Sequence, residues 1–251
     1  MRIFKIIFLV VFVLSVFTGL FINLSPQFGS NPSSYQKKLY SRFGNYVNGE
    51  FKNDEPTKLF TEEMSMANFF KDHPNQVPKK DIIPMELDIE SFKSQSNGKF
   101  KLSWLGHSAF IMNLGGNIIL LDPMLGQFAA PVPVPSLKRY STQIAFSVED
   151  IDTIDMVVYS HDHYDHLDYS TIKKIKGKVG LFIVPHGVGN HLRSWGVPEQ
   201  SIIELNWNDS KEINGIEFVC LPARHFSGRG PFNRNSTLWS SWAIKSEHGK
   251  I

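Results

Sequence analysis

Residues 159–170 read YSHDHYDHLDYS and place three histidines and three aspartates within the eight positions 161–168. The whole chain of 251 residues has only nine histidines. The stretch begins within the apolar, β-branched run IDMVVYS (154–160), which predicts a buried strand. Packing gives no reason to gather so many titratable groups at the end of a buried strand, so the pattern indicates a metal site.

The spacing of these side chains suits two metal ions. His161 and His163 are two positions apart, and in extended chain such side chains project to the same side, so both can face one ion. Asp165 and His166 follow as the chain turns toward a helix and can face a second ion. Imidazole and carboxylate groups are the usual zinc donors where cysteine is absent. A third donor for the first ion must come from elsewhere, and His225, at the end of another predicted strand, is the best candidate.

From Lys99 onward the pattern of predicted strands and helices is typical of a mixed α/β domain. Hairpin signals occur at Gly115–Gly116 and at Asn214–Gly215. Asp168 is placed to cap a helix over 169–176. A strand and a helix are predicted next, over 178–185 and 187–195. Strand clusters followed by strand–helix alternation favour a layered α/β fold.

The first residues predict a membrane segment. Arg2 and Lys5 precede an uncharged apolar run over 6–22, near the lower limit of about 17 residues for a membrane-spanning helix. No good Ala-x-Ala-like cleavage site follows, so an uncleaved anchor is favoured and a cleaved signal peptide is the alternative. The positive residues before the run favour a cytoplasmic N-terminus and an extracytoplasmic catalytic domain. Cleavage would instead give an exported soluble form.

Composition limits the classes of function. The formal charge is +2 with no lysine or arginine block, so we expect no nucleic-acid partner. The single cysteine, Cys220, cannot form an internal disulfide and is interpreted as a core thiol. We divide the chain into an anchor or signal segment (1–24), a proline-rich tether and N-terminal wrap (25–98) with a helical piece over 61–72, and the catalytic domain (99–251). The oligomeric state is left open.

HDHYDH (161–166) resembles the His-x-His-x-Asp-His signature of the metallo-β-lactamase superfamily. Within that superfamily the chain resembles the branch that contains N-acylphosphatidylethanolamine-hydrolysing phospholipase D and related bacterial zinc hydrolases. The resemblance runs from Lys99 to Ile244 and implies an α/β fold, a four-layer αββα sandwich with a dizinc site between its sheets. The stretches that carry it, in chain order, are WLGHSAF, ILLDPML, LKRY, YSHDHYDHLDYSTIKKI and ARHFSGRGPFNRNSTLWSSWAI.

The resemblance also implies a role for each site residue. His161, His163 and His225 would hold the first zinc, and Asp165 and His166 the second, so that the complete enzyme would carry two Zn²⁺. Histidine-rich sites accept several divalent ions, so zinc itself is an expectation. Water activated by the metals would attack a phosphorus or carbonyl centre, with no serine or cysteine nucleophile.

Other residues are given supporting roles or none. Asp165 would also orient the attacking water. Asp122 would orient a ligand histidine through its far nitrogen, and His107 would lie near the mouth of the site. Three further histidines match no ligand position and are interpreted as ordinary surface or helix residues: His186, His191 and His248.

The chain also departs from the family pattern. A metal-bridging aspartate and a last histidine, which the resemblance implies, would follow the final residues AIKSEHGKI (243–251). We therefore interpret the chain as the N-terminal part of an enzyme whose second half is incomplete. We expect this form to have weak activity or none, and the complete gene product to be a dizinc hydrolase.

The leading functional hypothesis is a membrane-associated phosphodiesterase of phospholipase D type, acting on N-acylphosphatidylethanolamine-like lipids. A lactonase or another ester or amide hydrolase is the alternative, because this superfamily uses one metal centre for many reactions. A non-catalytic, truncated metal-binding fragment is a third hypothesis. Five aromatic residues either line an acyl groove or belong to the core: Trp104, Phe110, Phe128, Trp239 and Trp242.

Overall fold

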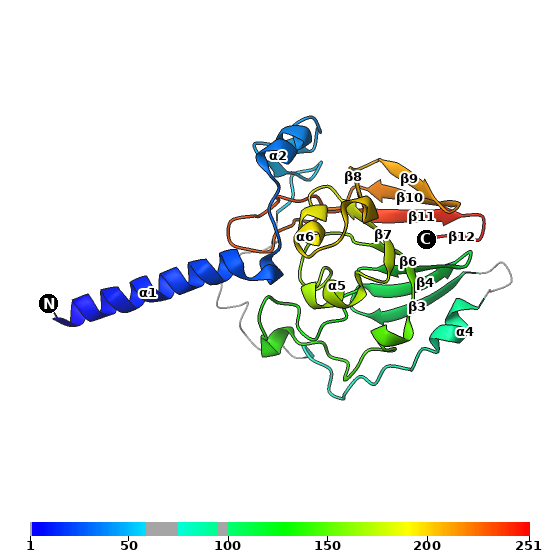
Figure 1. The fold of residues 1–251 in the computed structure, drawn as a ribbon, viewed down its shortest axis with the longest axis horizontal. Coiled ribbons are helices and arrows are strands. Elements are labelled where there is room, and N and C mark those ends of the chain that lie inside the picture. The colour runs from blue at the N-terminus through cyan, green and yellow to red at the C-terminus, as the bar shows by residue number, and fades with distance from the viewer. Residues whose placement is uncertain (1, 59–74, 95–99) are drawn as a thin grey trace.

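The computed structural model describes residues 2–58, 75–94 and 100–251. The helix predicted over 61–72 lies outside these residues. Figure 1 shows a long N-terminal helix that projects from a body built of two sheets and several short helices.

The larger sheet has six strands in the order β3-β4-β5-β6-β7-β8. Its first three strands pair antiparallel, and β5 to β8 pair parallel. The predicted strands over 154–160 and 178–185 are confirmed as β6 and β7. The bounds are β3 (Lys101–Gly106), β4 (Ala109–Leu114), β5 (Asn117–Leu121), β6 (Ile154–Val158), β7 (Val179–Pro185) and β8 (Ile202–Leu205).

The smaller sheet has four antiparallel strands in the order β12-β11-β10-β9. This is the second sheet of the expected sandwich. Its strands are β9 (Ser210–Ile213), β10 (Ile216–Leu221), β11 (Ser241–Ser246) and β12 (Gly249–Lys250).

Both hairpins predicted from the turn residues are confirmed. Gly115 and Gly116 join β4 to β5, and both have positive φ, at 61° and 87°. Asn214 and Gly215 join β9 to β10 with φ of 51° and 75°. Two central residues with positive φ define the turn whose twist matches that of paired strands, and glycine and asparagine adopt it at little cost.

Short helices connect the parallel strands. Helix α5 (Tyr169–Ile175) leads from β6 to β7, and α6 (Gly189–Ser194) leads from β7 to β8. The predicted cap is confirmed, because the Asp168 carboxylate accepts hydrogen bonds from the backbone N–H groups of Ser170 and Thr171. The remaining helices and strands are α1 (Arg2–Leu24), η1 (Pro26–Phe28), α2 (Ser34–Tyr40), β1 (Tyr46–Val47), β2 (Glu50–Phe51), α4 (Ile89–Lys93), η2 (Pro135–Leu137), η3 (Val148–Asp150) and η4 (Glu199–Ser201).

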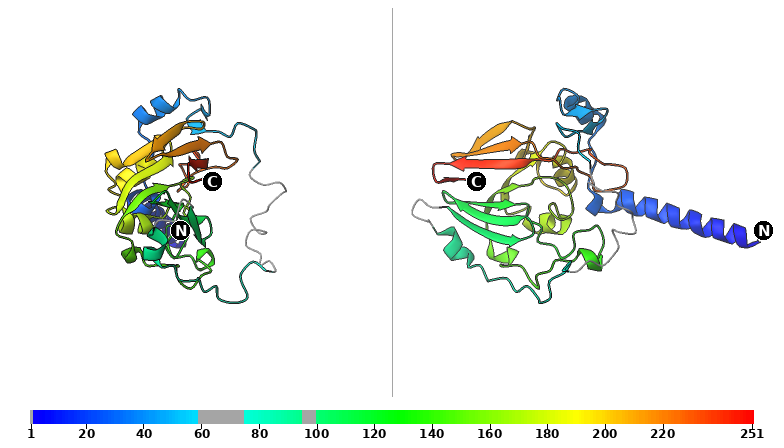
Figure 2. Two further views of the ribbon diagram at one scale, coloured as in Figure 1. Left: turned by 90° about the vertical axis from the view of Figure 1, so that its right-hand side faces the viewer. Right: turned by 180° about the vertical axis from the view of Figure 1, so that it is seen from behind.

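The six-stranded sheet is buried on both faces, as strand β7 shows. Phe182 and Val184 pack in a core with α5 and α6, whereas Ile183 between them packs in a second core with β10 and β11. Cys220 lies in that second core and is fully buried, as predicted. Figure 2 shows the two sheets as adjacent layers, and the predicted layered α/β architecture is confirmed.

The sheet topology brings the residues that follow several strands to one edge. Strands β3 and β5 are both antiparallel to β4, and β6 is parallel to β5, so all three end at the same side. His107, Asp122 and His161 lie in the loops just after these strands. Crevices outside the carboxyl ends of strands are the usual ligand sites of α/β sheets.

Asp168 should contribute measurably to stability. Besides capping α5, its carboxylate accepts a hydrogen bond from Gly126 N at 3.0 Å and from Thr171 Oγ1 at 2.6 Å. We expect Asp168→Ala to lower the free energy of unfolding by about 1–2 kcal/mol, the usual cost of losing a cap. Urea unfolding of the protein in detergent measures this. The exposed Asp152, changed to alanine, is the control, and equal stability of the two variants would contradict the assignment.

Candidate metal centre

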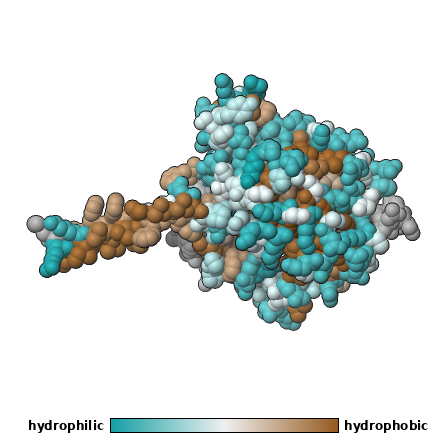
Figure 3. Space-filling view, in the orientation of Figure 1, coloured by the Kyte–Doolittle hydropathy of each residue, from teal (hydrophilic) through white to brown (hydrophobic). Residues whose placement is uncertain are grey.

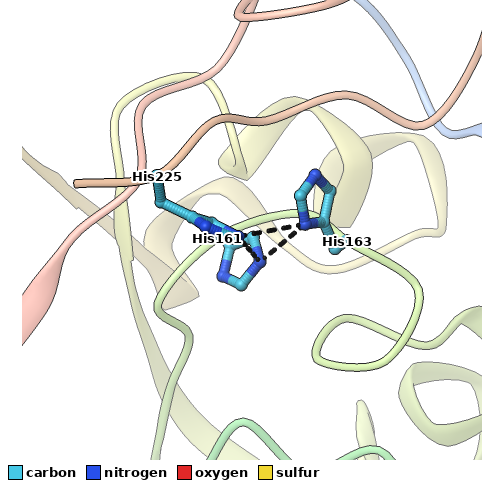
Figure 4. Close-up of side chains that lie close together, drawn as sticks. All are labelled: His161, His163 and His225. Carbon is cyan, nitrogen blue, oxygen red and sulfur yellow. Dashed lines mark hydrogen bonds between the residues drawn. The ribbon is translucent and has the colours of Figure 1, made fainter. Parts of the chain in front are cut away.

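Three histidine side chains from two loops converge at the carboxyl edge of the sheet. Nε2 of His161 lies 2.9 Å from Nδ1 of His163, and Nε2 of His225 lies 3.0 Å and 3.2 Å from these two nitrogens. His161 and His163 follow β6, and His225 follows β10 in the other sheet. Figure 4 shows the three rings pointing toward one another. The structure thus brings together the three residues that the sequence predicted for a first ion.

This arrangement has the geometry of a metal site. Two nitrogens each about 2.05 Å from a tetrahedral zinc ion lie about 3.3 Å apart, close to the separations seen here. A neutral imidazole has one N–H and one lone pair, so three rings cannot satisfy three mutual nitrogen contacts by hydrogen bonds alone. A cation among the nitrogens would accept all three lone pairs at once. The donor set therefore fits a divalent ion.

A second group of donors lies beside the first. Nε2 of His107 is 2.9 Å from Oδ2 of Asp165, and Nε2 of His166 is 3.7 Å from the same oxygen. The rings of His161 and His166 are 4.1 Å apart, so the two groups are neighbours. Asp165 and His166 were predicted to share an ion. His107, predicted only to lie near the mouth of the site, is half exposed and completes this group of three.

Asp122 holds two of these histidines in place. Its Oδ2 lies 2.8 Å from Nδ1 of His166 and 2.6 Å from Oγ of Ser160, which in turn lies 2.8 Å from Nδ1 of His161. Ser160 N–H also donates to Asp122 Oδ1 at 2.6 Å. A carboxylate on Nδ1 fixes the ring and leaves Nε2 free to bind metal. The structure places Asp122 where the resemblance implied, on the far nitrogen of a candidate ligand.

Two residues of the site have unusual backbone conformations. His107 has a φ of 45° and Asp122 a φ of 41°, in the left-handed region that glycine favours. Such conformations cost free energy and persist where the surrounding structure imposes them, often at functional sites. Here they occur where β3 and β5 leave the sheet, and they bring both side chains next to His166.

Burial keeps the first group of donors neutral. It lowers the pKa of His161, His163 and His225 below the usual value for histidine, and the neighbouring rings add to this effect for His161 and His225. Neutral imidazole is the form that binds metal. For His166 burial also lowers the pKa, but the hydrogen bond and the charge of Asp122 outweigh it, so that the net pKa is raised.

The sequence analysis missed the residue that braces His225. The side chain of Asn53 donates to the backbone carbonyl of His225 at 2.9 Å and accepts from its N–H at 3.1 Å. Trp239 Nε1 donates to the same Asn53 oxygen at 3.0 Å. Asn53 is separated from His225 by 172 positions in the chain, and no local pattern marks it.

The sequence analysis also missed two buried charged residues behind the site, Asp162 and Arg229. Asp162, within the histidine stretch itself, is fully buried and accepts hydrogen bonds from His191 and Thr237. Arg229 is 2% exposed and bonds backbone carbonyls of the same stretch. His191 was interpreted as an ordinary surface or helix residue; it lies in helix α6, but its ring is fully buried against Asp162 and is not at the surface. Two features of the sequence could have indicated these residues: the extra aspartate in HDHYDH, which is Asp162, and the second arginine in ARHFSGRG, which is Arg229.

The five aromatic residues that were predicted either to line an acyl groove or to belong to the core differ in exposure. Trp239 is 1% exposed and belongs to the core, whereas Trp104 is 63% exposed. The indole N–H of Trp104 donates to the backbone carbonyl of His107 at 2.8 Å, which holds an apolar surface beside the second group. The other three are partly buried: Phe110, Phe128 and Trp242.

Comparison with known proteins agrees with this geometry. Residues 117–251, more than half of the chain, match a family model described as Beta-lactamase superfamily domain. An uncharacterized protein of Mycobacterium tuberculosis is 38% identical over 206 residues, which cover 80% of this chain and 54% of the relative. The N-acyl-phosphatidylethanolamine-hydrolyzing phospholipase D 1 of Caenorhabditis elegans is 32% identical over 207 residues, covering 74% of this chain and 57% of the relative.

A metal-dependent hydrolase of Sulfurisphaera tokodaii is a more distant relative. It is 31% identical over 129 residues, which cover 51% of each chain. The chain thus spans little more than half the length of the curated relatives that it matches.

Asp122→Asn should weaken zinc binding. The amide can still accept from Ser160 N–H, but its NH₂ group cannot accept the proton that His166 Nδ1 offers, so the ring loses its fixed orientation. We expect a loss of about 10–100-fold in zinc affinity, measured by competition with a chromophoric chelator.

Asp155→Asn is the matched control. Asp155 lies on the same strand, β6, and its carboxylate accepts a backbone hydrogen bond from Ile118 at 2.7 Å, away from the histidines. Equal zinc affinities for the two variants would show that Asp122 does not orient a ligand.

Proposed function

The chain belongs to the β-lactamase superfamily, as the sequence predicted, and from this premise we propose that it is a metal-dependent hydrolase acting on a lipid phosphodiester. The observation that carries the proposal is the convergence of three imidazole nitrogens, from two loops, within 3.2 Å of one another. Relatives named as metal-dependent hydrolase and as phospholipase D support the reaction class.

The two groups of donors would hold two ions. His161, His163 and His225 would bind the first, and Asp165 and His166, with His107 as an added donor, the second. Nitrogen and oxygen donors of this kind suit zinc, and cysteine does not take part, because Cys220 is buried in the core.

The side chains of the site would have different roles in hydrolysis. When bound, the metal ions would lower the pKa of water and stabilise negative charge on the substrate. The Asp165 carboxylate, which is 42% exposed, would accept a hydrogen bond from the attacking water and orient it. Asp122 would keep the proton of His166 on Nδ1 and so keep Nε2 available.

A lipid substrate is favoured over a soluble one by three features. One relative in Caenorhabditis elegans and another in Saccharomyces cerevisiae are named as enzymes that hydrolyse N-acylphosphatidylethanolamine. Trp104 offers an exposed indole beside His107, suited to an acyl chain or to the interfacial region of a bilayer. The third feature is helix α1.

Helix α1 is long and apolar enough to cross a membrane. Its 23 residues span about 34 Å at about 1.5 Å per residue, and the hydrocarbon core of a bilayer is about 30 Å thick. None of these residues is buried, and Figure 3 shows the helix as an apolar rod beside a largely polar body. We propose that α1 anchors the catalytic domain, residues 99–251, on the extracytoplasmic side; a signal sequence would share its length and composition.

The lipid assignment predicts a specific product. The complete gene product, purified with bound zinc, should release phosphatidic acid from N-acylphosphatidylethanolamine in mixed micelles, measured by mass spectrometry. His163→Ala should lower this rate by about 100-fold or more, because losing a metal ligand removes several kcal/mol of transition-state stabilisation, at about 1.4 kcal/mol per tenfold.

His248→Ala is the matched control, because His248 belongs to neither donor group and lies beside Glu247. A zinc-bound protein that opens lactones but releases no phosphatidic acid would replace the phospholipase hypothesis with that of a lactonase. A zinc-bound complete gene product without turnover on either substrate would leave only a metal-binding role.

The anchor assignment is tested separately. An uncleaved α1 should keep the protein in the membrane pellet after alkaline carbonate extraction, with its N-terminal sequence intact. Protease added outside spheroplasts should digest the domain and spare α1, since only the bilayer protects it. Release of a soluble domain lacking residues 1–24 would show that the segment is a cleaved signal peptide instead.

A further inference from the structure

The short segment between α1 and α2 contacts the body directly. We call residues 26–30 the exit segment, because the chain leaves α1 there. Its backbone makes hydrogen bonds with three side chains of the body. Trp195 Nε1 donates to the carbonyl of Pro26 at 2.7 Å, Arg229 donates to the carbonyl of Gln27, and Ser30 N–H donates to Nδ1 of His191 at 3.0 Å.

Arg229 connects the exit segment to the loop after β6, which carries four of the candidate ligands. Its Nε and Nη2 donate to the carbonyl of Gln27 at 3.0 Å and 2.8 Å. Its Nη1 donates to the carbonyls of Asp162 and Leu167, at 2.5 Å and 2.7 Å, near the two ends of that loop. The guanidinium also lies over the ring of Tyr164, 4.1 Å from its centroid.

A buried guanidinium needs all these acceptors. Arg229 is 2% exposed, and a buried charge with unpaired donors is strongly destabilising. The Gln27 carbonyl accepts from two of its three nitrogens. The exit segment must therefore be in place for Arg229 to hold the loop in this conformation.

The second connection runs through His191 and Asp162. Because Ser30 N–H donates to Nδ1 of His191, the proton of that ring lies on Nε2, which faces Oδ2 of Asp162 at 3.2 Å. Asp162 sits between His161 and His163 in the sequence. Its carboxylate also accepts from Thr237 Oγ1 at 2.9 Å and from Gly228 N at 2.8 Å, in the stretch that follows His225.

Both connections therefore end on the two loops that carry the three-histidine group. We propose that the exit segment is a positioning element of the metal centre, so that the centre binds zinc with full affinity only when residues 26–30 are seated against Arg229 and His191. The inference rests on the proposed function, since it requires zinc at His161, His163 and His225. It makes the membrane-proximal segment a part of the site and not a passive tether.

A substitution at Gly29 can disrupt the contact between the exit segment and His191 without changing a candidate metal ligand. It has a φ of 69°, and a Cβ added there would overlap Nδ1 and Cγ of His191. Gly29→Ala should therefore push the exit segment off His191. Gly49→Ala is the matched control, because Gly49 has a φ of 84° and nothing within 4 Å of an added Cβ. The control carries the backbone strain of alanine at positive φ without the overlap.

The test measures zinc affinity of the full chain in detergent by chelator competition, at a temperature well below unfolding. We expect Gly29→Ala to bind zinc about 10–100-fold more weakly than wild type, as for loss of other partners that orient ligands, and Gly49→Ala to match wild type. Circular dichroism and thermal unfolding with EDTA show whether each variant is folded without metal.

Trp195→Phe keeps the inference testable if Gly29→Ala does not fold. It removes the hydrogen bond to Pro26 and should weaken zinc binding in the same direction by a smaller factor. Zinc affinity of folded Gly29→Ala equal to that of Gly49→Ala, or of Trp195→Phe equal to that of wild type, would overturn the inference and leave the proposed function standing. Absence of zinc binding in the wild type would overturn both.

Discussion

The metal centre depends on bringing one nitrogen from each of three imidazole rings to within 3.2 Å of one another. Nothing in the rings themselves favours this approach, because one N–H per ring cannot bridge three contacts. The surrounding protein must impose it, and burial that lowers the pKa of His161, His163 and His225 removes the charge repulsion that protonated rings would add. The three-histidine group is therefore held in the neutral form, which is the form that binds a cation.

The support for this approach comes from loops of both sheets and from the N-terminal region. Asp122, after β5, holds rings on the loop after β6. Asn53, beyond β2, holds the backbone of His225 after β10. Asp162 links the loop after β6 to the stretch that follows His225. Each support is a buried or half-buried hydrogen bond to a charged or amide group, the kind whose loss leaves an unpaired partner and costs most.

The features that depend only on neighbouring residues could be predicted from the sequence. Gly115–Gly116 and Asn214–Gly215 specify their turns whatever surrounds them, and Asp168 caps its helix with atoms only two or three residues away. His161 to His166 could be assigned because they are adjacent in the chain and chemically conspicuous. The distant residues that hold the site in place could not be predicted. The contact of Asn53 with His225, for example, depends on packing across 172 positions. The buried contact of His191 could not be predicted for the same reason: its partner Asp162 lies 29 positions away.

The bond between Arg229 and the Gln27 carbonyl spans 202 positions, most of the chain. Contacts of such sequence separation form late, because closing a long loop costs entropy before any contact repays it. During synthesis the exit segment emerges long before its partner, and the buried network behind the histidines cannot close until Arg229 has been made. Ordering of the metal centre therefore includes a long-range closure between residues 26–30 and Arg229, which can form only after both have been synthesised.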